Sequence, residues 1–370
     1  MAQRFDVAVI GAGMAGASIA AELAPHASVL VLEGEDAPGY HTTGRSAAFW
    51  EEAYGGPGVY PLTAASGRWL RAMGFLSPRG ALNIGRARDR GKVEAFVARL
   101  AGLGARVELL GRKGLERHVP GLRPGWDWAS WEPDCADIDV AGLHQHYLAA
   151  GRNAGSVLRL RARAEVAERE GSGWRIGWNG GEALAGVLVN AAGAWADQVA
   201  AMAGAAPCGI TPFRRTVAQL RTAPEPPANL PLTLGINEQF YFKPQSGRVW
   251  LSPHDETPDV PRDTAPEEID VATAIDRVGK VVDWKIEAVE RKWAGLRSFA
   301  PDRLPVYGFD PGREGLFWFA GQGGFGIQTA PAAARLAAQQ VLGLSPDAMT
   351  GRLDPAIYAP SRFCNSKPTN

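Results

Sequence analysis

Three glycines near the start of the chain have the spacing of a phosphate-binding turn. The run Gly11-Ala-Gly13-Met-Ala-Gly16 follows the apolar stretch 6–10 and precedes the stretch 17–23, whose apolar residues have helical spacing. The first glycine permits the tight turn, the second lets a diphosphate approach the backbone, and the third lets the helix pack on the strand. Free N–H groups at the helix start then face the diphosphate. The spacing predicts a dinucleotide-binding unit.

An acidic residue completes this unit. Residues 28–32 predict a second strand, and Glu33 follows them directly. A carboxylate at this position accepts hydrogen bonds from ribose hydroxyls and disfavours a 2′-phosphate, so we do not expect NADP. A glycine-rich turn in another α/β fold is the alternative, but the order strand, glycines, helix, strand and acid favours dinucleotide binding.

The polar segment 34–48 favours FAD over NAD. A nicotinamide-binding fold would place a crossover helix here, whereas this segment is interrupted by glycines. We expect it to lie along an extended ligand, and a solvated surface loop is the alternative. Its possible donors to phosphate and ring edges are Thr42, Thr43, Arg45 and Ser46.

Further motifs resemble those of the D-amino-acid oxidase superfamily of FAD-dependent enzymes. The resemblance runs from about residue 5 to residue 340, and within the superfamily it is strongest to the bacterial D-arginine dehydrogenases. Besides the opening glycines it rests on Gly39-Tyr-His-Thr-Thr-Gly44-Arg45-Ser46, Leu188-Val-Asn190-Ala-Ala-Gly193-Ala-Trp195, Trp293-Ala-Gly295-Leu-Arg297 and Gly323-Gly-Phe-Gly326-Ile-Gln328-Thr329.

The resemblance implies an α/β (α+β) fold. We expect a Rossmann-like FAD-binding domain with an inserted substrate domain, whose sheet is mixed or antiparallel. The FAD-binding domain would comprise residues 1–77, 138–206 and 298–344, the substrate domain residues 78–137 and 207–297, and the C-terminal tail residues 345–370. The last ten residues of that tail are expected to fray.

The resemblance also implies how FAD is held. No cysteine lies where related enzymes attach the flavin, so the cofactor is expected to be non-covalent. Backbone N–H groups and a helix start after Gly323 would stabilise negative charge on the flavin. The expected FAD-binding residues are Gly11, Gly13, Met14, Ala15, Gly16, Glu33, Gly44, Arg45, Ser46, Ala47, Val166, Ala192, Gly193, Trp195, Gly323, Gly324, Phe325, Gly326 and Gln328.

Oxidation of an amino acid by FAD requires a grip on the carboxylate, because the Cα–H bond must face flavin N5 as hydride leaves. Arginine suits this task, since its planar fork binds a carboxylate bidentately and stays charged. Arg214 and Arg215 could instead be surface charges of an edge strand. The resemblance implies a catalytic set of Tyr54, Arg215, Tyr241, Arg297 and Gln328.

The resemblance breaks where the substrate side chain would be recognised. D-Arginine dehydrogenases have a glutamate near the match to Ala81, and an alanine cannot pair with a buried cation. Glu51 could replace that carboxylate, or Glu51 and Glu52 could both face water. Aromatic side chains favour an apolar or aromatic substrate side chain instead. The expected pocket residues are Phe49, Trp50, Glu51, Ala81 and Phe325, together with Tyr241.

We therefore expect oxidative deamination of a free D-amino acid through an imino acid, which water hydrolyses to a 2-oxo acid and ammonia. The alternatives are an N-alkyl or cyclic secondary amino acid, a 2-hydroxy acid, or a non-catalytic flavin-binding protein. Sarcosine-oxidase-like relatives carry a lysine over the flavin, and residues 246–251 contain none. This favours a dehydrogenase that passes electrons to a quinone or another acceptor.

Composition excludes several other classes. Thirty-nine Lys+Arg balance 39 Asp+Glu, so overall charge does not drive binding to nucleic acid. Three cysteines without paired spacing predict neither a disulfide framework nor a metal site. The glycine motif accounts for the apolar stretch 7–24, so we expect no transmembrane segment and a cytoplasmic location.

Overall fold

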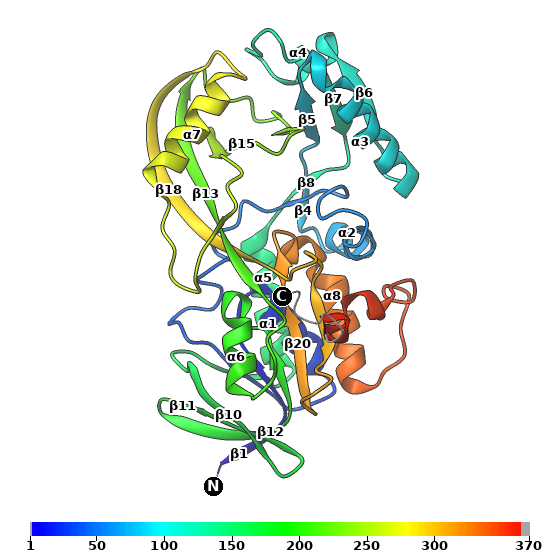
Figure 1. Ribbon diagram of the computed structural model, residues 1–370, viewed down its shortest axis with the longest axis vertical. Coiled ribbons are helices and arrows are strands. Elements are labelled where there is room, and N and C mark those ends of the chain that lie inside the picture. Colours follow the sequence, from blue (N-terminus) through cyan, green and yellow to red (C-terminus); the bar gives the residue numbers. More distant parts are fainter. Residues whose placement is uncertain (1, 364–370) are drawn as a thin grey trace, which may run out of the picture.

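The computed structural model describes residues 2–363. The molecule is elongated, with one sheet at each end (Figure 1). Two long antiparallel strands, β13 (Thr211–Ala223) and β18 (Lys285–Phe299), run between the ends.

The first sheet is built around the predicted dinucleotide-binding unit. Strand β1 (Gln3–Ile10) pairs in parallel with β2 (Val29–Leu32), and helix α1 (Met14–Leu23) connects them. All four residues of β2 are buried, as expected for a parallel strand covered on both faces. The other strands are β9 (Val157–Arg159), β10 (Ala164–Glu170), β11 (Gly173–Trp178), β12 (Gly181–Asn190), β19 (Val306–Phe309) and β20 (Leu316–Ala320).

The glycine turn is as close-packed as its spacing predicts. Gly11 has φ +100°, and a Cβ on it would lie 2.6 Å from the carbonyl oxygen of Ala191. A Cβ on Gly16 would lie 1.8 Å from the carbonyl oxygen of Gly11. Only glycine lets helix α1 approach the end of β1 this closely.

The second sheet decides which arginine faces the centre of the molecule. In the β13–β18 ladder Arg215 lies opposite Gly295, and Phe213 lies opposite Arg297. Paired residues, and residues two apart on a strand, share a face, so Arg215 and Arg297 project from the same face. Arg214 points the other way and forms ion pairs with Glu267 and Asp270. The remaining strands are β5 (Ala81–Gly85), β6 (Glu108–Gly111), β7 (Trp128–Glu132), β14 (Leu232–Gly235), β15 (Tyr241–Gln245), β16 (Arg248–Ser252), β17 (Thr257–Pro258) and β21 (Gln322–Gly323).

A three-stranded sheet and most helices lie around these two sheets. The small sheet comprises β3 (Phe49–Trp50), β4 (Leu76–Pro78) and β8 (Ala136–Ile138). The further helices are α2 (Tyr60–Ala72), α3 (Arg90–Leu103), α4 (Arg112–His118), α5 (Val140–Asn153), α6 (Ala196–Met202), α7 (Glu268–Gly279) and α8 (Gly326–Leu342), with short 3₁₀ turns at Ala87–Asp89, Gly193–Trp195, Pro355–Tyr358 and Pro360–Phe363.

The strands of the second sheet come from residues 81–132 and 211–299, with β21 added at its edge. This distribution supports the two-domain division that we propose from the sequence. After α8 the chain packs back on the first domain: the Tyr358 hydroxyl donates to the Gly58 carbonyl oxygen at 2.8 Å, and Arg362 pairs with Asp302. Fraying is therefore wrong for residues 361–363, and residues 364–370 lie outside the described range.

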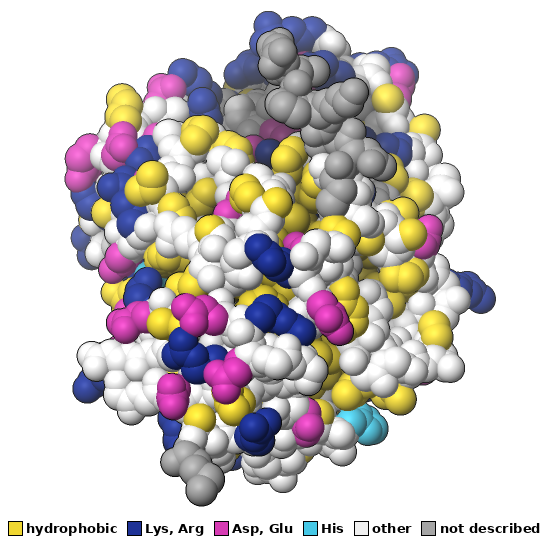
Figure 2. All heavy atoms as spheres, turned by 60° about the horizontal axis from the view of Figure 1, so that its bottom comes forward, with side chains coloured by type: hydrophobic (Ala, Val, Ile, Leu, Met, Phe, Trp, Pro, Cys, Tyr) yellow, Lys and Arg dark blue, Asp and Glu magenta, His cyan; other side chains and the backbone are white. Residues whose placement is uncertain are grey.

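The surface gives no sign of a membrane span. No helix within residues 2–363 is long and apolar enough to cross a bilayer. On the face in Figure 2, basic and acidic side chains lie interspersed over the middle and lower parts.

Replacement of Gly16 should destabilise the protein. The Cβ of Gly16→Ala has no room, so we expect the free energy of unfolding to fall by about 1–3 kcal/mol in urea denaturation. Gly91→Ala in α3 is the matched control, because no atom lies within 4 Å of its added Cβ. Equal stability of Gly16→Ala and wild type would contradict this account.

Candidate active site

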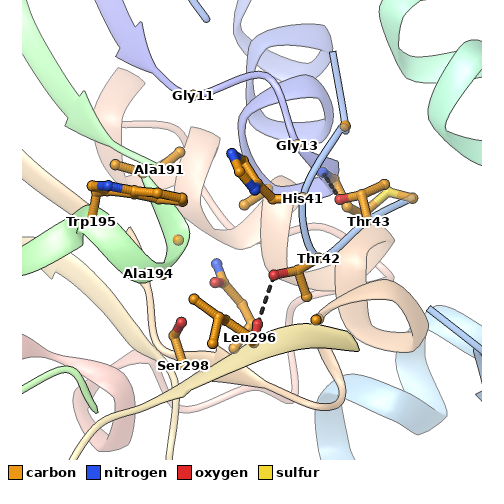
Figure 3. Close-up of a pocket in the computed structure, with 18 of the residues that line it drawn as sticks. Gly11, Gly13, His41, Thr42, Thr43, Ala191, Ala194, Trp195, Leu296 and Ser298 are labelled. Carbon is orange, nitrogen blue, oxygen red and sulfur yellow. Dashed lines mark hydrogen bonds between the residues drawn. The ribbon is translucent and has the colours of Figure 1, made fainter. Parts of the chain in front are cut away.

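A long cavity runs from Glu33, at the carboxyl edge of the first sheet, to Arg297 on the second sheet. In Figure 3 Gly11, Gly13 and Thr43 lie on one side of the pocket, and Leu296 and Ser298 lie on the other. Most of the residues expected from the sequence line it: Gly11, Gly13, Met14, Ala15, Glu33, Arg45, Ser46, Ala47, Ala192, Gly193, Trp195, Arg215, Tyr241, Arg297, Gly323, Gly324 and Gly326.

Glu33 is held rigidly at its end of the cavity. Its Oε2 accepts a hydrogen bond from Ala12 N at 2.9 Å, and its Oε1 accepts one from Glu35 N at 3.0 Å. Each carboxylate oxygen keeps a second lone pair, which can accept from a ribose hydroxyl.

The segment 39–46 holds the two sheets together. Thr43 Oγ1 accepts from Met14 N at 2.9 Å and so caps helix α1, while Thr42 Oγ1 donates to the Leu296 carbonyl oxygen at 2.6 Å (Figure 3). The Arg45 guanidinium donates to the Ala294 carbonyl oxygen at 3.1 Å and pairs with Asp263. Thr42 and Arg45, expected as donors to the ligand, thus bond to the second domain and its loops.

Arg215 presents an unused donor. Its Nε donates to the Asp255 carbonyl oxygen at 2.8 Å, and its Nη2 donates to Glu256 Oε1 at 3.2 Å. Its Nη1 is buried and has no hydrogen-bond partner among residues 2–363. Burial, and next the charge of Arg297, lower the pKa of Arg215 to about 10, so the guanidinium stays protonated at neutral pH.

Arg297 faces the cavity without an acidic partner. Its Nη1 donates to the Tyr54 hydroxyl at 2.8 Å, and no carboxylate of the described chain lies within 4.0 Å of it. A buried donor without a partner is costly, and so is a cation without an anion. The chemistry of Arg215 and Arg297 in the cavity therefore fits an anion.

His254 is a neighbour of this site that the sequence did not reveal. Its ring packs edge-on against Tyr241, with ring centroids 5.9 Å apart. Burial, then Arg215 and Arg297, lower the pKa of His254 to about 3, so it is neutral. Its Nδ1 lies 2.7 Å from the Glu238 carbonyl oxygen, so Nδ1 carries the hydrogen and Nε2 is an acceptor. Its loop follows β16 and has no motif that could have identified it.

Gln328 does not line the cavity, contrary to the prediction. Its Nε2 donates to Thr63 Oγ1 at 2.9 Å and to the Tyr54 carbonyl oxygen at 3.3 Å, and its Oε1 accepts from Glu51 N at 3.2 Å. Its amide is therefore used to hold residues 51–54 against helix α8.

Four other expected FAD-binding residues, and Tyr54 of the expected catalytic set, also lie outside the lining. Phe325 packs on Phe299 and Tyr54 at the start of α8. Gly16 packs on Gly11, and the Gly44 N–H donates to the Gly39 carbonyl oxygen within its own loop. Val166 lies beyond a bulge in β10, where it faces Gly177 of β11, and the cavity is lined by residues 162–164 instead.

Trp50 belongs to the core and not to the substrate pocket. It follows Phe49 on a strand, where successive side chains point to opposite faces. Its ring is 1% exposed in the cluster that contains Met14 and Leu70, and its Nε1 donates to the Thr63 carbonyl oxygen at 3.1 Å.

The other pocket residues meet in one apolar cluster beside the arginines. Phe49 contacts Tyr241 and Tyr54, with ring centroids 6.1 Å and 5.8 Å apart. The cluster comprises Ala47, Phe49, Ala81, Cys135, Leu232, Leu234 and Tyr241.

A buried pair of carboxyl groups adjoins this cluster. Glu51 is 2% exposed, so the expectation that it faces water is wrong. It lies beside Glu132, which stands directly opposite Ala81 on the neighbouring strand. Burial raises the pKa of Glu51 to about 7. Position 81 has no carboxyl group, but Glu132 places one on the neighbouring strand, directly opposite Ala81.

Comparison with known proteins settles the family. A family model described as DAO, FAD dependent oxidoreductase, matches residues 6–340. The chain is a member of this family. Its cofactor is FAD, as in this family, and the cavity that extends from the glycine turn and Glu33 to Arg297 suits such a dinucleotide. Gly13 and Gly193 leave open space beside the backbone, where a diphosphate fits. A Cβ added to Gly13 would contact only Thr43 Oγ1, and a Cβ added to Gly193 would have no atom within 4 Å.

Relatives of the DAO protein include enzymes with several substrates. It is 27% identical over 252 residues to a glycine oxidase of Pseudomonas aeruginosa, and the match spans 66% of this chain and 65%, less than two thirds, of that relative. Its structure resembles a glycine oxidase from Geobacillus kaustophilus (TM-score 0.86, 22% identity, 97% and 99% of the two chains covered) and an L-proline dehydrogenase from P. horikoshii (0.85, 22%, 98% and 98%). These matches confirm the fold class. The closer resemblance to D-arginine dehydrogenases stays a prediction.

FAD should be released intact when the DAO protein is denatured. Precipitation with acid and centrifugation should leave all the flavin absorbance in the supernatant, because the cavity lining contains no cysteine. Chromatography of the supernatant checks this expectation. Flavin that stays with the precipitated polypeptide would contradict it.

Proposed function

We propose that this DAO protein oxidises a free D-amino acid to an imino acid, which water hydrolyses to a 2-oxo acid and ammonia. The observation that carries the proposal is the anion site, in which Arg215 Nη1 has no partner and Arg297 has no acidic partner. An amino-acid carboxylate supplies the missing charge and matches the fork geometry of both guanidinium groups.

The residues around the cavity have separate roles in this reaction. When bound, FAD supplies the oxidant that accepts the hydride equivalent from Cα. Arg215 and Arg297 grip the carboxylate, and the hydroxyls of Tyr54 and Tyr241 are further donors for it. The N-terminus of α8, with Gly326 and Ile327 at the cavity, favours negative charge there.

The apolar cluster around Phe49 supports a substrate with a hydrophobic or aromatic side chain. Ala81 and Leu234 in this cluster are apolar, so they could not pair with a charged substrate side chain. A basic side chain is the alternative, which the buried Glu51 and Glu132 favour. The structural resemblance to an L-proline dehydrogenase favours a cyclic secondary amino acid as the second candidate substrate. The same clamp would also accept a 2-hydroxy acid, and a non-catalytic flavin-binding protein would bind an acid without oxidising it.

Anaerobic bleaching of the flavin tests the proposal. D-Phe, D-Leu and D-Met should bleach it faster than D-Arg and D-Lys, and faster than L-amino acids, N-methyl amino acids and 2-hydroxy acids. Arg297→Ala should raise KM about 10- to 100-fold, the loss of a charge-assisted hydrogen bond. Arg291→Ala on the exposed part of β18 is the matched control.

Each other outcome changes the assignment. Faster bleaching by D-Arg or D-Lys would reverse the ranking and make Glu51 and Glu132 the readers of the side chain. A flavin that none of these compounds bleaches would contradict oxidation altogether.

The electron acceptor is proposed to be a quinone or another acceptor. The absence of lysine in residues 246–251 supports this, and the nearby Lys243 is bonded to Asp137 at 2.7 Å. Turnover should be fast with an artificial dye and slow with oxygen. Hydrogen peroxide formed as fast as substrate is consumed would identify an oxidase.

A further inference from the structure

Residues 51–54 are held from both domains at once. From α8, the Gln328 amide bonds the Glu51 N–H and the Tyr54 carbonyl oxygen. Within the segment, Tyr54 N donates to the Glu51 carbonyl oxygen at 3.2 Å. Tyr54 then accepts from Arg297 through its hydroxyl. Helix α8 holds one side of residues 51–54. The position of the Tyr54 hydroxyl therefore also depends on the contacts that hold the opposite side.

Glu132 fixes that side. Its carboxyl group interacts with the Ala53 N–H and with the carboxyl group of Glu51. Asn83 Nδ2 lies between the two, 3.4 Å from Glu51 Oε1 and 3.4 Å from Glu132 Oε1. Glu132 and Asn83 belong to neighbouring strands of the second sheet, and both are buried. A rigid sheet thus holds a loop of the other domain.

The contact requires a proton. Burial, followed by the charge of Glu51, raises the pKa of Glu132 well above its usual range. A raised pKa favours the protonated carboxyl group of Glu132, and in that form it can donate a hydrogen bond to Glu51. The other titratable groups around the pair are Glu52, Cys135 and Glu238, while Asp137 and Lys243 act on Cys135. None of those next to the pair is a base that would stabilise two negative charges.

We propose that Glu132 is a positioning residue, which acts through Glu51 and residues 52–53 to hold the Tyr54 hydroxyl against Arg297. The space there is narrow, because a Cβ on Gly324 would lie 2.1 Å from that hydroxyl. Gly55 (φ +95°) and Gly56 (φ +72°) follow directly, so the chain turns away immediately after Tyr54 and the segment 51–54 is fixed by the contacts of Glu51 and its neighbours. This role rests on the proposed function, since Tyr54 and Arg297 serve a carboxylate.

The test is a double-mutant cycle on carboxylate binding. The holoprotein is titrated with acetate and the change in flavin absorbance gives Kd at pH 7. Glu132→Ala should weaken binding about tenfold while FAD stays bound, because one charge-assisted hydrogen bond is misplaced. In a Tyr54→Phe background the same substitution should have no further effect, since both act through one hydroxyl. Glu108→Gln on the exposed edge strand β6 is the matched control for Glu132→Gln, because it makes the same substitution away from the site.

The pH dependence is a second readout, in which the conservative variant differs from wild type. Glu132 has a raised pKa, so its contact is present at low pH and is lost as pH rises through that pKa. Wild type and Glu108→Gln should therefore lose acetate affinity as the pH is raised. Glu132→Gln, whose amide donates at every pH, should bind acetate as wild type does at pH 7 and lose no affinity.

The outcomes separate the two proposals. Acetate binding that disappears in Arg297→Ala but is unchanged in every Glu132 variant would overturn the positioning role and leave the proposed function intact. Additive effects of Glu132→Ala and Tyr54→Phe would also overturn it. A wild-type holoprotein that binds no carboxylate would overturn both.

Discussion

The guanidinium groups of Arg215 and Arg297 lie on one face of the second sheet, and most of the site is arranged around these two positive charges. Arg215 and Arg297 repel each other, and burial removes the water that would screen them. The fold compensates only partly, with the Asp255 carbonyl oxygen, the Glu256 carboxylate and the Tyr54 hydroxyl. The remaining positive potential is directed into the cavity, so an anionic ligand completes the electrostatics that the chain leaves unfinished.

This arrangement works only if the nucleotide-binding sheet and the arginine-bearing sheet keep their relative positions. Residues 39–46 link them, because Thr43 caps helix α1 while Thr42 and Arg45 bond to β18. Gln328 and residues 51–54 form a second link. Polar groups that sequence reasoning assigned to the ligand thus serve largely to join the domains.

Local patterns made much of the fold and part of the site predictable. The glycine turn, the strand that precedes Glu33 and Glu33 itself depend on neighbours in sequence. Arg215 was chosen over Arg214 by resemblance, and the ladder register places it on the same face as Arg297. Trp50, Gln328 and Val166 were misplaced, because strand alternation, an amide shared between segments and a β-bulge are not visible in a motif. Glu132 and His254 were missed, since only strand pairing brings Glu132 to Glu51 and only a loop brings His254 to Tyr241.

The long ladder between β13 and β18 has a mechanical consequence. Thirteen residue pairs join these strands (Figure 1), and the end of β18 pairs with β21, which directly precedes α8. Swinging the two ends of the molecule apart would bend this ribbon and break the Arg45–Asp263 ion pair. The ladder therefore resists bending between the two ends, which favours local loop movement as the way for small molecules to reach the cavity.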